Sequence, residues 1–373
     1  MPIIRFGLPL SLLLIGSFAF AQAAEKSSQH DPATQPGVVS VEYLTDGAPH
    51  KSCHASTIAL TPQGLVAAWF GGTREGAKDV GIYFNRQIDG KWATPTEVAD
   101  GVQYVSPDGK QHRHPCWNPV LHQEPDGPLL LFYKCGPSPS EWWGMLMTST
   151  DGGATWSAPR RLPEGIDGPV KNKAIQHGDL LVCPSSTEYD GWRLHLEMTP
   201  DLGRTWTRVG PLNDGKKIGA IQPSVLVYPN GRWQLLARDR QNNGNVWSTW
   251  SDDEGITWTK LASTGLPNPN SGTDALVLDD GRALLVYNHT SRSGPFPSGR
   301  HMLNVAISPD GEKWEAAITL EKSAGEFSYP AVIQTPDGLV HVTYTWKRKK
   351  VRHVTIDPKK LSTRPIVDGV WPE

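Results

Sequence analysis

A short apolar run of β-forming residues follows a glycine-containing turn six times along the chain. The six segments are P-Q-G-L-V-A-A-W-F (62–70), P-D-G-P-L-L-L-F-Y (125–133), H-G-D-L-L-V-C (177–183), P-N-G-R-W-Q-L-L-A (229–237), D-D-G-R-A-L-L-V-Y (279–287) and P-D-G-L-V-H-V-T-Y (336–344). Glycine between alternating or continuous β-formers is a strong signal for a short hairpin. We therefore predict that each turn joins the first and second strands of a repeated unit.

A second motif, called the Asp box below, is interleaved with these turns. It reads S-T-D-G-G-A-T-W at Ser149–Trp156 and returns at Thr199–Trp206, Ser251–Trp258 and, one residue shorter, Ser308–Trp314, with a degenerate echo at 88–92. Its Asp and Gly favour a tight turn, and its Trp is an apolar anchor that packs back under that turn. The copies recur every 50–57 residues or so, which is typical of arrays and propellers. The boxes are predicted to be structural.

Together the two motifs predict four strands per unit and six units, which is an all-β, six-bladed β-propeller with Asp-box repeats. The sixth unit has no box after its third strand, which is expected at 351–356. Val38–Leu44 reads as a strand and is expected to supply the missing outer strand, because closure removes an exposed sheet edge. Residues 37–373 are thus expected to form a single propeller domain.

The N-terminus has the pattern of an export signal. Arg5 supplies a positive start, Leu8–Phe20 is apolar, and small residues near position 21 offer a cleavage site. The apolar run is too short to cross a membrane comfortably. We expect a signal peptide over 1–23, a disordered polar lead-in over 24–36, and a periplasmic or secreted protein that is not inserted in a membrane after cleavage.

Charge and cysteine content bear on three questions: nucleic-acid binding, disulfide bonds and metal binding. A formal net charge of −2 argues against nucleic acid, which needs a basic surface. Cys116 and Cys135 flank one predicted turn and are the most plausible disulfide pair; buried free thiols are an equal alternative, and Cys53 and Cys183 are harder to pair. No Cys or His spacing indicates a metal, so no metal or cofactor is expected. The oligomeric state is left open.

Propeller topology locates a site without any motif. The start of the first strand and the end of the second lie at one end of the molecule near the axis, so polar residues on either side of the glycine turns should converge there. These residues are His54, Trp117, Asn118, Lys171, Lys173, Gln222, Asp274 and Tyr329 before the turns, Arg74, Lys134, Glu188, Arg238, Arg240, Asn288, His289, Arg292 and Arg348 after them, and Asp79 and Arg300 on the connections to third strands. The set is strongly cationic, which predicts a receptor for carboxylate, sulfate or phosphate, because guanidinium groups bind such anions bidentately.

In the order of its repeats, the whole mature chain resembles the sialidase (neuraminidase) superfamily, in a divergent branch. That resemblance implies a six-bladed propeller whose three arginines hold the carboxylate of sialic acid. It also implies a Tyr nucleophile assisted by a Glu, with an Asp as acid/base.

Three segments carry the resemblance to the family's site. Phe70–Asp79 resembles the segment with the acid/base Asp, so Asp79 is the proton-donor candidate and Arg74 precedes it. The second triad arginine corresponds to Arg238 or Arg240, and the third to Arg300.

The chain departs from the family at three positions. His54 stands where the first triad arginine is expected, and Gln222, an amide that cannot act as a base, stands at the Glu position. The nucleophile aligns most simply with Phe327. Tyr329, two residues on and expected on the same strand face, is the substitute.

Three hypotheses follow. The first is an exo-glycosidase that releases a terminal acidic sugar: Asp79 donates the proton, Tyr329 or water attacks, and the other site residues bind the substrate. Those substrate-binding residues are Arg74, Arg238, Arg240, Arg300, Gln222, Asn118 and Lys173. The second is a uronate lyase in which His54 and Tyr329 serve as base and acid. The third is a propeller that binds acidic glycans without turnover; Trp117, Trp142 and Trp143 could stack on sugars in any of the three.

Overall fold

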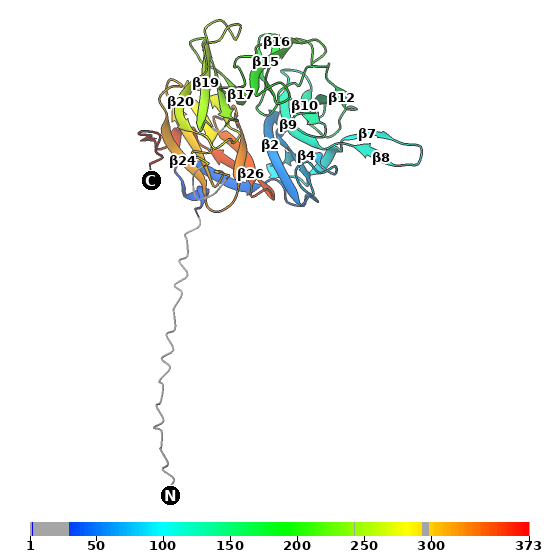
Figure 1. Cartoon of the computed structure of the whole chain (residues 1–373), viewed down its shortest axis with the longest axis horizontal. Coiled ribbons are helices and arrows are strands. Elements are labelled where there is room, and N and C mark those ends of the chain that lie inside the picture. Colours follow the sequence, from blue (N-terminus) through cyan, green and yellow to red (C-terminus); the bar gives the residue numbers. More distant parts are fainter. Residues whose placement is uncertain (1, 3–29, 242, 293–297, 373) are drawn as a thin grey trace.

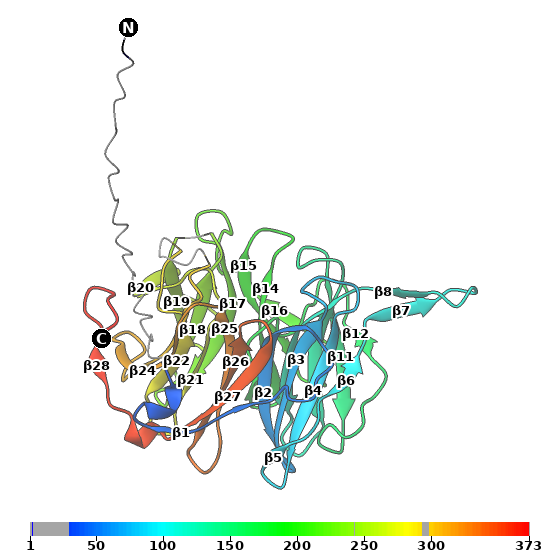
Figure 2. The ribbon, with the colours of Figure 1, turned by 90° about the horizontal axis from the view of Figure 1, so that it is seen from below.

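The structure, a computed structural model, describes Pro2 and residues 30–372 except 242 and 293–297. The expected signal peptide therefore lies outside the described residues apart from Pro2. Within the described chain, six antiparallel sheets surround an axis (Figures 1 and 2). Most neighbouring sheets contact one another through their first strands, whereas the third sheet contacts the first strand of the fourth through its own second strand. The predicted all-β, six-bladed propeller is confirmed.

The first three blades run in chain order. Their strands are β2 (Ser52–Thr61), β3 (Gly64–Gly72), β4 (Gly81–Ile88), β5 (Lys91–Trp92) and β6 (Thr96–Ala99) in blade 1; β9 (Cys116–Gln123), β10 (Leu129–Cys135), β11 (Trp143–Ser149) and β12 (Arg160–Arg161) in blade 2; and β13 (Ile175–His177), β14 (Leu180–Thr187), β15 (Arg193–Thr199) and β16 (Thr207–Val209) in blade 3.

The last three blades repeat the pattern. Their strands are β17 (Ala220–Val227), β18 (Trp233–Asp239), β19 (Asn245–Ser251) and β20 (Ala262–Pro267) in blade 4; β21 (Asp274–Val277), β22 (Ala283–Tyr287), β23 (Met302–Ser308), β24 (Glu315–Lys322) and β28 (Arg364–Pro365) in blade 5; and β25 (Phe327–Gln334), β26 (Val340–Trp346), β27 (Lys350–Ile356) and β1 (Val38–Tyr43) in blade 6. Each glycine turn joins a first and a second strand, as the sequence predicts.

Burial on both faces explains why the second strands read as continuous apolar runs. All of β10 is buried, because neighbouring blades cover both faces of each sheet. Blades 5 and 6, for example, share one core in which Leu284 and Val305 lie with Val342 and Val354. Burial of this apolar surface is the main stabilising term of the ring.

The Asp boxes are turns between third and fourth strands, as predicted. Ser149 Oγ donates to Asp151 Oδ1 at 2.7 Å and accepts from the Gly153 amide at 2.8 Å. The side chain and the amide of Thr155 both donate to Asp151, and these bonds lower the pKa of that carboxyl to about 2. Gly153 has φ 85°, and a Cβ there would lie 2.1 Å from the Phe84 ring of blade 1, so glycine is required.

The ring closes with the N-terminal strand, as predicted. β1 pairs antiparallel with β27, for instance Val41 with Val354. The expected disordered lead-in over 24–36 is wrong for 30–36: η1 (Pro32–Thr34) packs there with Pro32 buried, and His30 Nε2 contacts the Thr319 carbonyl. Residues 24–29 lie outside the described part of the chain. After blade 6 the chain continues through η2 (Pro358–Lys360).

Cys116 and Cys135 are directly opposite each other on β9 and β10. All four cysteines are nevertheless free and buried, so the structure corresponds to the free-thiol alternative.

One hairpin was not foreseen. β7 (Val102–Val105) and β8 (Gln111–Arg113) pair between blades 1 and 2 and project from the ring (Figures 1 and 2).

In the described part of the chain, no helix has the length and apolar character needed to span a membrane.

Closure through β1 gives a testable prediction. A chain that starts at residue 44 leaves the β27 edge unpaired, so it should aggregate or melt roughly 10 °C lower than a chain that keeps β1. A chain that starts at residue 30 keeps η1 and β1 and serves as the control. Size-exclusion chromatography and thermal unfolding measure both. Equal stability of the two truncations would contradict the closing role of β1.

Candidate functional site

Irregular first strands turn side chains toward the axis. The register between first and second strands shifts in four blades, at segments that contain Ala55, Asn118, Gln222 and Tyr329. These residues have φ of 54°, 38°, 54° and 54°, in the left-handed region that residues other than glycine adopt mainly at turns and functional sites. Each lies nine residues before the glycine of its turn, as Tyr329 does before Gly338. The predicted convergence of these positions is therefore built into the backbone.

Tyr329 is the centre of the site. The Arg238 Nη1 group donates to Tyr329 Oη at 2.5 Å and to Gln222 Oε1 at 2.9 Å. The guanidinium carbons of Arg238 and Arg300 lie 5.3 and 5.5 Å from the centre of the tyrosine ring. Tyr329 is half-buried, so this contact places a partly accessible phenol between two cations.

A carboxylate holds the other arginines in place. Glu326 accepts from Arg300 Nη1 at 2.8 Å through Oε1 and from Arg348 Nε at 3.0 Å through Oε2. Burial opposes the charge of Glu326, but Arg300 and Arg348 lower its pKa to about 2. Arg348 also pairs with Glu75 at 2.5 Å. We refer to Tyr329, Arg238, Arg300, Arg348 and Glu326 as the tyrosine–arginine cluster.

Arg238 and Arg300 differ in their spare donors. Arg238 is 4% exposed and also donates through Nη2 to the backbone carbonyl and side chain of Asn270. Its terminal N–H groups are therefore already used. Arg300 donates to Glu326 and to the Asn270 carbonyl, and its bonds to described residues leave N–H groups for an incoming anion. Arg348 uses Nε for Glu326 and Nη1 for Glu75, so these pairs leave its Nη2 group, as the bonds of Arg300 leave N–H groups.

His54 lies beneath Tyr329 and does not reach the pocket surface. It is 1% exposed, its Nδ1 is 2.8 Å from Thr345 Oγ1, and its ring centre is 4.1 Å from that of Tyr329. Burial and then the surrounding cations, Arg348 foremost, lower the pKa of His54 well below its ordinary value. A neutral, covered imidazole supports the tyrosine ring; in this arrangement it cannot act as a base on a substrate.

Two lysines from the segment before β13 cross between blades. Lys171 Nζ donates to the Thr273 carbonyl at 2.9 Å and to the Pro330 carbonyl. Lys173 Nζ pairs with Asp274 at 3.0 Å and donates to the Ala275 carbonyl at 2.7 Å. Lys173, predicted to bind substrate, is thus held in an interblade ion pair.

No described hydrogen bond or ion pair joins Asp79 to the tyrosine–arginine cluster. Its carboxylate accepts from the hydroxyl and the amide of Thr73 at 2.5 and 2.8 Å, and the hydroxyl bond is the first cause of the lowered pKa of Asp79. The charged side chains that interact with it include Arg113 and Glu97. An exposed carboxylate held in its ionised form is poorly suited to donate a proton.

The remaining predicted binding residues lie apart. Arg240 stacks on Trp192, with its guanidinium carbon 4.7 Å from the ring centre, so Arg238 is the arginine of that segment that joins the cluster. Arg74 is exposed and Asn118 is 5% exposed; no described side-chain contact links either one to Tyr329.

The expected alignment of Phe327 with Tyr329 on one strand face is wrong. Phe327 is fully buried in the core shared by blades 5 and 6, whereas Tyr329 packs beside His54. The register shift between Ser328 and Ala331, together with the left-handed backbone of Tyr329, breaks the two-residue alternation.

Three residues that hold the cluster were not assigned to the site from sequence: Glu326, Glu75 and Asn270. Glu188 follows β14, and burial raises its pKa although Arg238 and Arg240 oppose the shift. Glu188 was predicted to lie at this end of the molecule, because it follows a glycine turn. Glu326, Glu75 and Asn270 lie on connections, where strand spacing carries no information.

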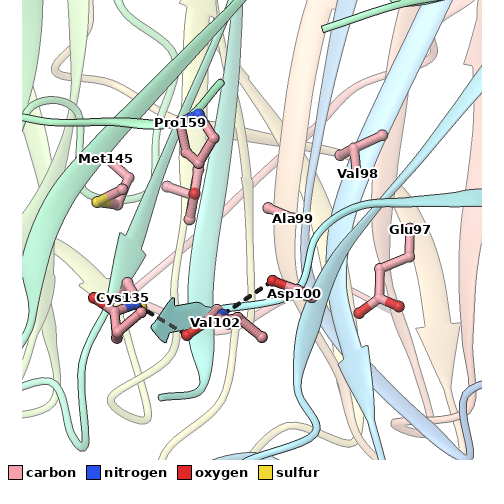
Figure 3. A pocket seen from close by; sticks show the side chains of 11 residues that line it. Glu97, Val98, Ala99, Asp100, Val102, Cys135, Met145 and Pro159 are labelled. Atoms are coloured by element: carbon pink, nitrogen blue, oxygen red, sulfur yellow. Dashed lines mark hydrogen bonds between the residues drawn. The ribbon is translucent and has the colours of Figure 1, made fainter. Parts of the chain in front are cut away.

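A separate hollow, shown in Figure 3, lies between blades 1 and 2. It has a volume of about 360 Å³, and its wall includes Glu97, Asp100, Cys135 and Met145. It contains no member of the tyrosine–arginine cluster, so it is not the candidate site.

Comparisons with known proteins bear on the family and the fold. A family model described as "BNR repeat-like domain" matches residues 63–342. A search of curated proteins gives no match.

Three solved structures are similar. A protein of unknown function from Dyadobacter fermentans is 18% identical with a TM-score of 0.67, over 89% of this chain and 100% of that chain. A K499G mutant of the NanB sialidase from Streptococcus pneumoniae is 12% identical with a TM-score of 0.67, over 88% and 71%. The intramolecular trans-sialidase from Ruminococcus gnavus, in complex with oseltamivir carboxylate, is 14% identical with a TM-score of 0.68, over 88% and 99%. At these identities the likeness shows the fold alone.

Lys171 makes stability depend on pH. Its burial lowers its pKa from 10.5 to about 7. Between pH 7 and 10.5 the unfolded chain therefore binds a proton that the native chain lacks, and this contribution to stability rises with pH. Against Lys171→Met, the wild type should gain about 1 kcal/mol of unfolding free energy per pH unit from pH 7 to 9.5. Denaturant unfolding at several pH values measures this. Lys110→Met, at the exposed hairpin tip, is the control. If the difference in unfolding free energy between the wild type and Lys171→Met did not change with pH, the lowered pKa of the buried Lys171 amine would be contradicted.

Proposed function

The chain belongs to the BNR repeat-like domain family, and from that premise we propose that it is a sialidase-like exo-glycosidase that releases a terminal sugar bearing a carboxylate. The observation that carries the proposal is the bond from Arg238 to Tyr329 Oη at 2.5 Å, which fixes a half-buried phenol between Arg238 and Arg300. A phenol oxygen beside a carboxylate receptor is the arrangement that glycosidases with a tyrosine nucleophile require.

The carboxylate of the sugar binds the spare N–H groups of Arg300 and Arg348. Glu326 already accepts one donor from each of them, so it fixes their orientation before substrate arrives, and preorganised donors bind with less loss of side-chain entropy. Because the guanidinium groups are held close together, a planar carboxylate is preferred over a neutral hydroxyl.

Tyr329 Oη then lies against the anomeric carbon. Either this oxygen or a water beside it forms the new bond to that carbon while the bond to the leaving oxygen breaks. The attacking O–H group gives up its proton to solvent water, because the amide of Gln222 cannot act as a base. The leaving oxygen takes a proton from a carboxylic acid. Attack by Tyr329 and then by water gives retention of configuration, whereas a single attack by water gives inversion. The anomer first released, read by NMR, distinguishes these two routes.

Two carboxyl groups compete as the proton donor. Asp79 occupies the family's position but is held ionised by Thr73. Glu188 lies near Arg238, and its pKa is raised by burial, as a group that must be protonated near neutral pH requires.

The uronate-lyase alternative loses its base, because His54 is covered by Tyr329 and 1% exposed. The third hypothesis, a propeller that binds acidic glycans without turnover, predicts that the wild type releases no sugar in the Tyr329→Phe experiment described next.

Tyr329→Phe removes the phenol oxygen and should lower kcat on a sialyl fluorogenic substrate, or on whichever acidic sugar is released, by at least about a hundredfold. Melting temperature should change little, since Tyr329 is half-buried. Tyr104→Phe, on the projecting hairpin, is the control. Uronate-capped oligosaccharides are run in parallel, with released sugar and ultraviolet absorbance as readouts. Full activity of Tyr329→Phe, or an absorbance rise that marks elimination, would contradict the proposal.

Glu188→Gln and Asp79→Asn separate the two proton donors. We expect Glu188→Gln to lose about a hundredfold in kcat on a natural glycoside and much less on a nitrophenyl glycoside, whose leaving group needs no proton. Asp79→Asn should retain most of its activity on both. The reverse pattern would return the role to Asp79, and activity retained by both variants would exclude both residues.

A further inference from the structure

A second pocket lies between blades 2 and 3 at the same end of the propeller as Tyr329. It has a volume of about 340 Å³. Trp142 and Trp143 line it at the start of β11, Arg161 at the end of β12, and Tyr189 on the connection after β14. The starts of third strands, the ends of fourth strands and the ends of second strands all lie at the site end of a blade. We call this hollow the aromatic pocket.

The walls of the aromatic pocket are aromatic and acidic. Tyr189 is 47% exposed, and Trp143 is half-buried, with Arg161 4.6 Å from its ring centre. Glu141 and Glu164 are exposed carboxylates in the lining. Arg161 is the cation among the lining residues, so carboxylates outnumber it, the opposite of the tyrosine–arginine cluster.

Asp167 supplies a buried polar group on the same wall. It is 3% exposed, and Tyr189 Oη lies 3.4 Å from its carboxylate. Burial, and then the neighbouring carboxylate of Glu197, raises the pKa of Asp167 to about 7. A carboxyl group that titrates near neutrality can donate to or accept from a hydroxyl group.

Trp142 is a buried tryptophan of the lining, and its indole N–H is a hydrogen-bond donor. Its side chain is 6% exposed, and its Nε1 has no hydrogen-bond partner among the described residues. A buried indole N–H usually finds an acceptor.

The aromatic pocket adjoins the tyrosine–arginine cluster. Trp142 packs on Trp117, which belongs to the first strand of blade 2, with ring centres 6.3 Å apart. Tyr189 directly follows Glu188, whose charge interacts with that of Arg238. A ligand that extends from one pocket over Glu188 therefore reaches the other.

We propose that the aromatic pocket binds a neutral sugar, with its ring against Trp143 and Tyr189 and its hydroxyl groups on Asp167 and the flanking carboxylates. Aromatic faces with a few fixed polar groups are typical of such sites, and the excess of carboxylates disfavours an acidic sugar. That this sugar is the one next to the terminal acidic residue of the substrate rests on the proposed function; the binding itself does not.

The test is ligand-observed NMR (saturation transfer) with lactose as the neutral probe and glucuronate as the acidic one, on the full mature chain. Lactose should bind the wild type and Tyr329→Phe equally. Its affinity should fall about tenfold in Trp143→Ala and in Tyr189→Ala, the loss of one aromatic contact, and also in Asp167→Asn. Tyr189 lies on an exposed loop, so its variant remains informative if Trp143→Ala does not fold. Trp250→Ala removes an arginine-covered tryptophan of blade 4, where Arg232 lies 4.5 Å from the ring, and should leave lactose binding unchanged.

The outcomes separate the two proposals. Lactose binding that is lost in the pocket variants supports the neutral-sugar pocket even if no substrate is turned over. Turnover of an acidic glycoside together with no lactose binding, or with binding unaffected by Tyr189→Ala and Asp167→Asn, overturns the pocket and leaves the proposed function standing. Glucuronate that binds the wild type but loses affinity in Tyr189→Ala also overturns it.

Discussion

The left-handed backbone of Tyr329 is the constraint on which the site depends. A regular strand would send this side chain into the sheet packing that Phe327 occupies two residues earlier. The register shift in β25 instead releases the ring toward His54 and Arg238. Left-handed backbone costs a non-glycine residue free energy of order 1–3 kcal/mol and persists only where surrounding contacts over-determine it. Here those contacts are the covered His54 ring below and the Arg238 guanidinium at the hydroxyl.

Charge balance decides what each pocket can bind. Three arginines gathered at one end would repel one another, and Glu326 offsets that repulsion by accepting from two of them. The same bonds fix the orientation of the spare N–H groups. In the aromatic pocket, between blades 2 and 3, carboxylates outnumber the cation around Trp143 and Tyr189, so the lining is acidic instead of cationic. A chain that is nearly neutral overall therefore presents two adjacent surfaces of opposite preference.

The fold was predictable from the sequence because both turn motifs are local. A glycine turn or an Asp box needs only a few adjacent residues, and six repeats leave no other arrangement that buries every apolar run. The end of the molecule that carries the site followed from topology alone. The left-handed backbone of the first strands could not be predicted, since residues as different as Ala55, Gln222 and Tyr329 adopt it, and Tyr329 and Phe327 were therefore placed on one face. The partners of the arginines, Glu326 and Asn270, lie on connections whose course depends on tertiary packing. Asp79 shows the converse: its place in the chain resembles the family, but its carboxylate is bonded to Thr73, and no described hydrogen bond or ion pair joins it to the cluster.

A crystal structure of the mature protein with a bound terminal acidic sugar tests the central claim most directly. The account predicts the sugar carboxylate within hydrogen-bond distance of Arg300 and Arg348, and Tyr329 Oη facing the anomeric carbon. A sugar bound with its carboxylate away from both arginines, or bound outside the end of the propeller where Tyr329 lies, would contradict it.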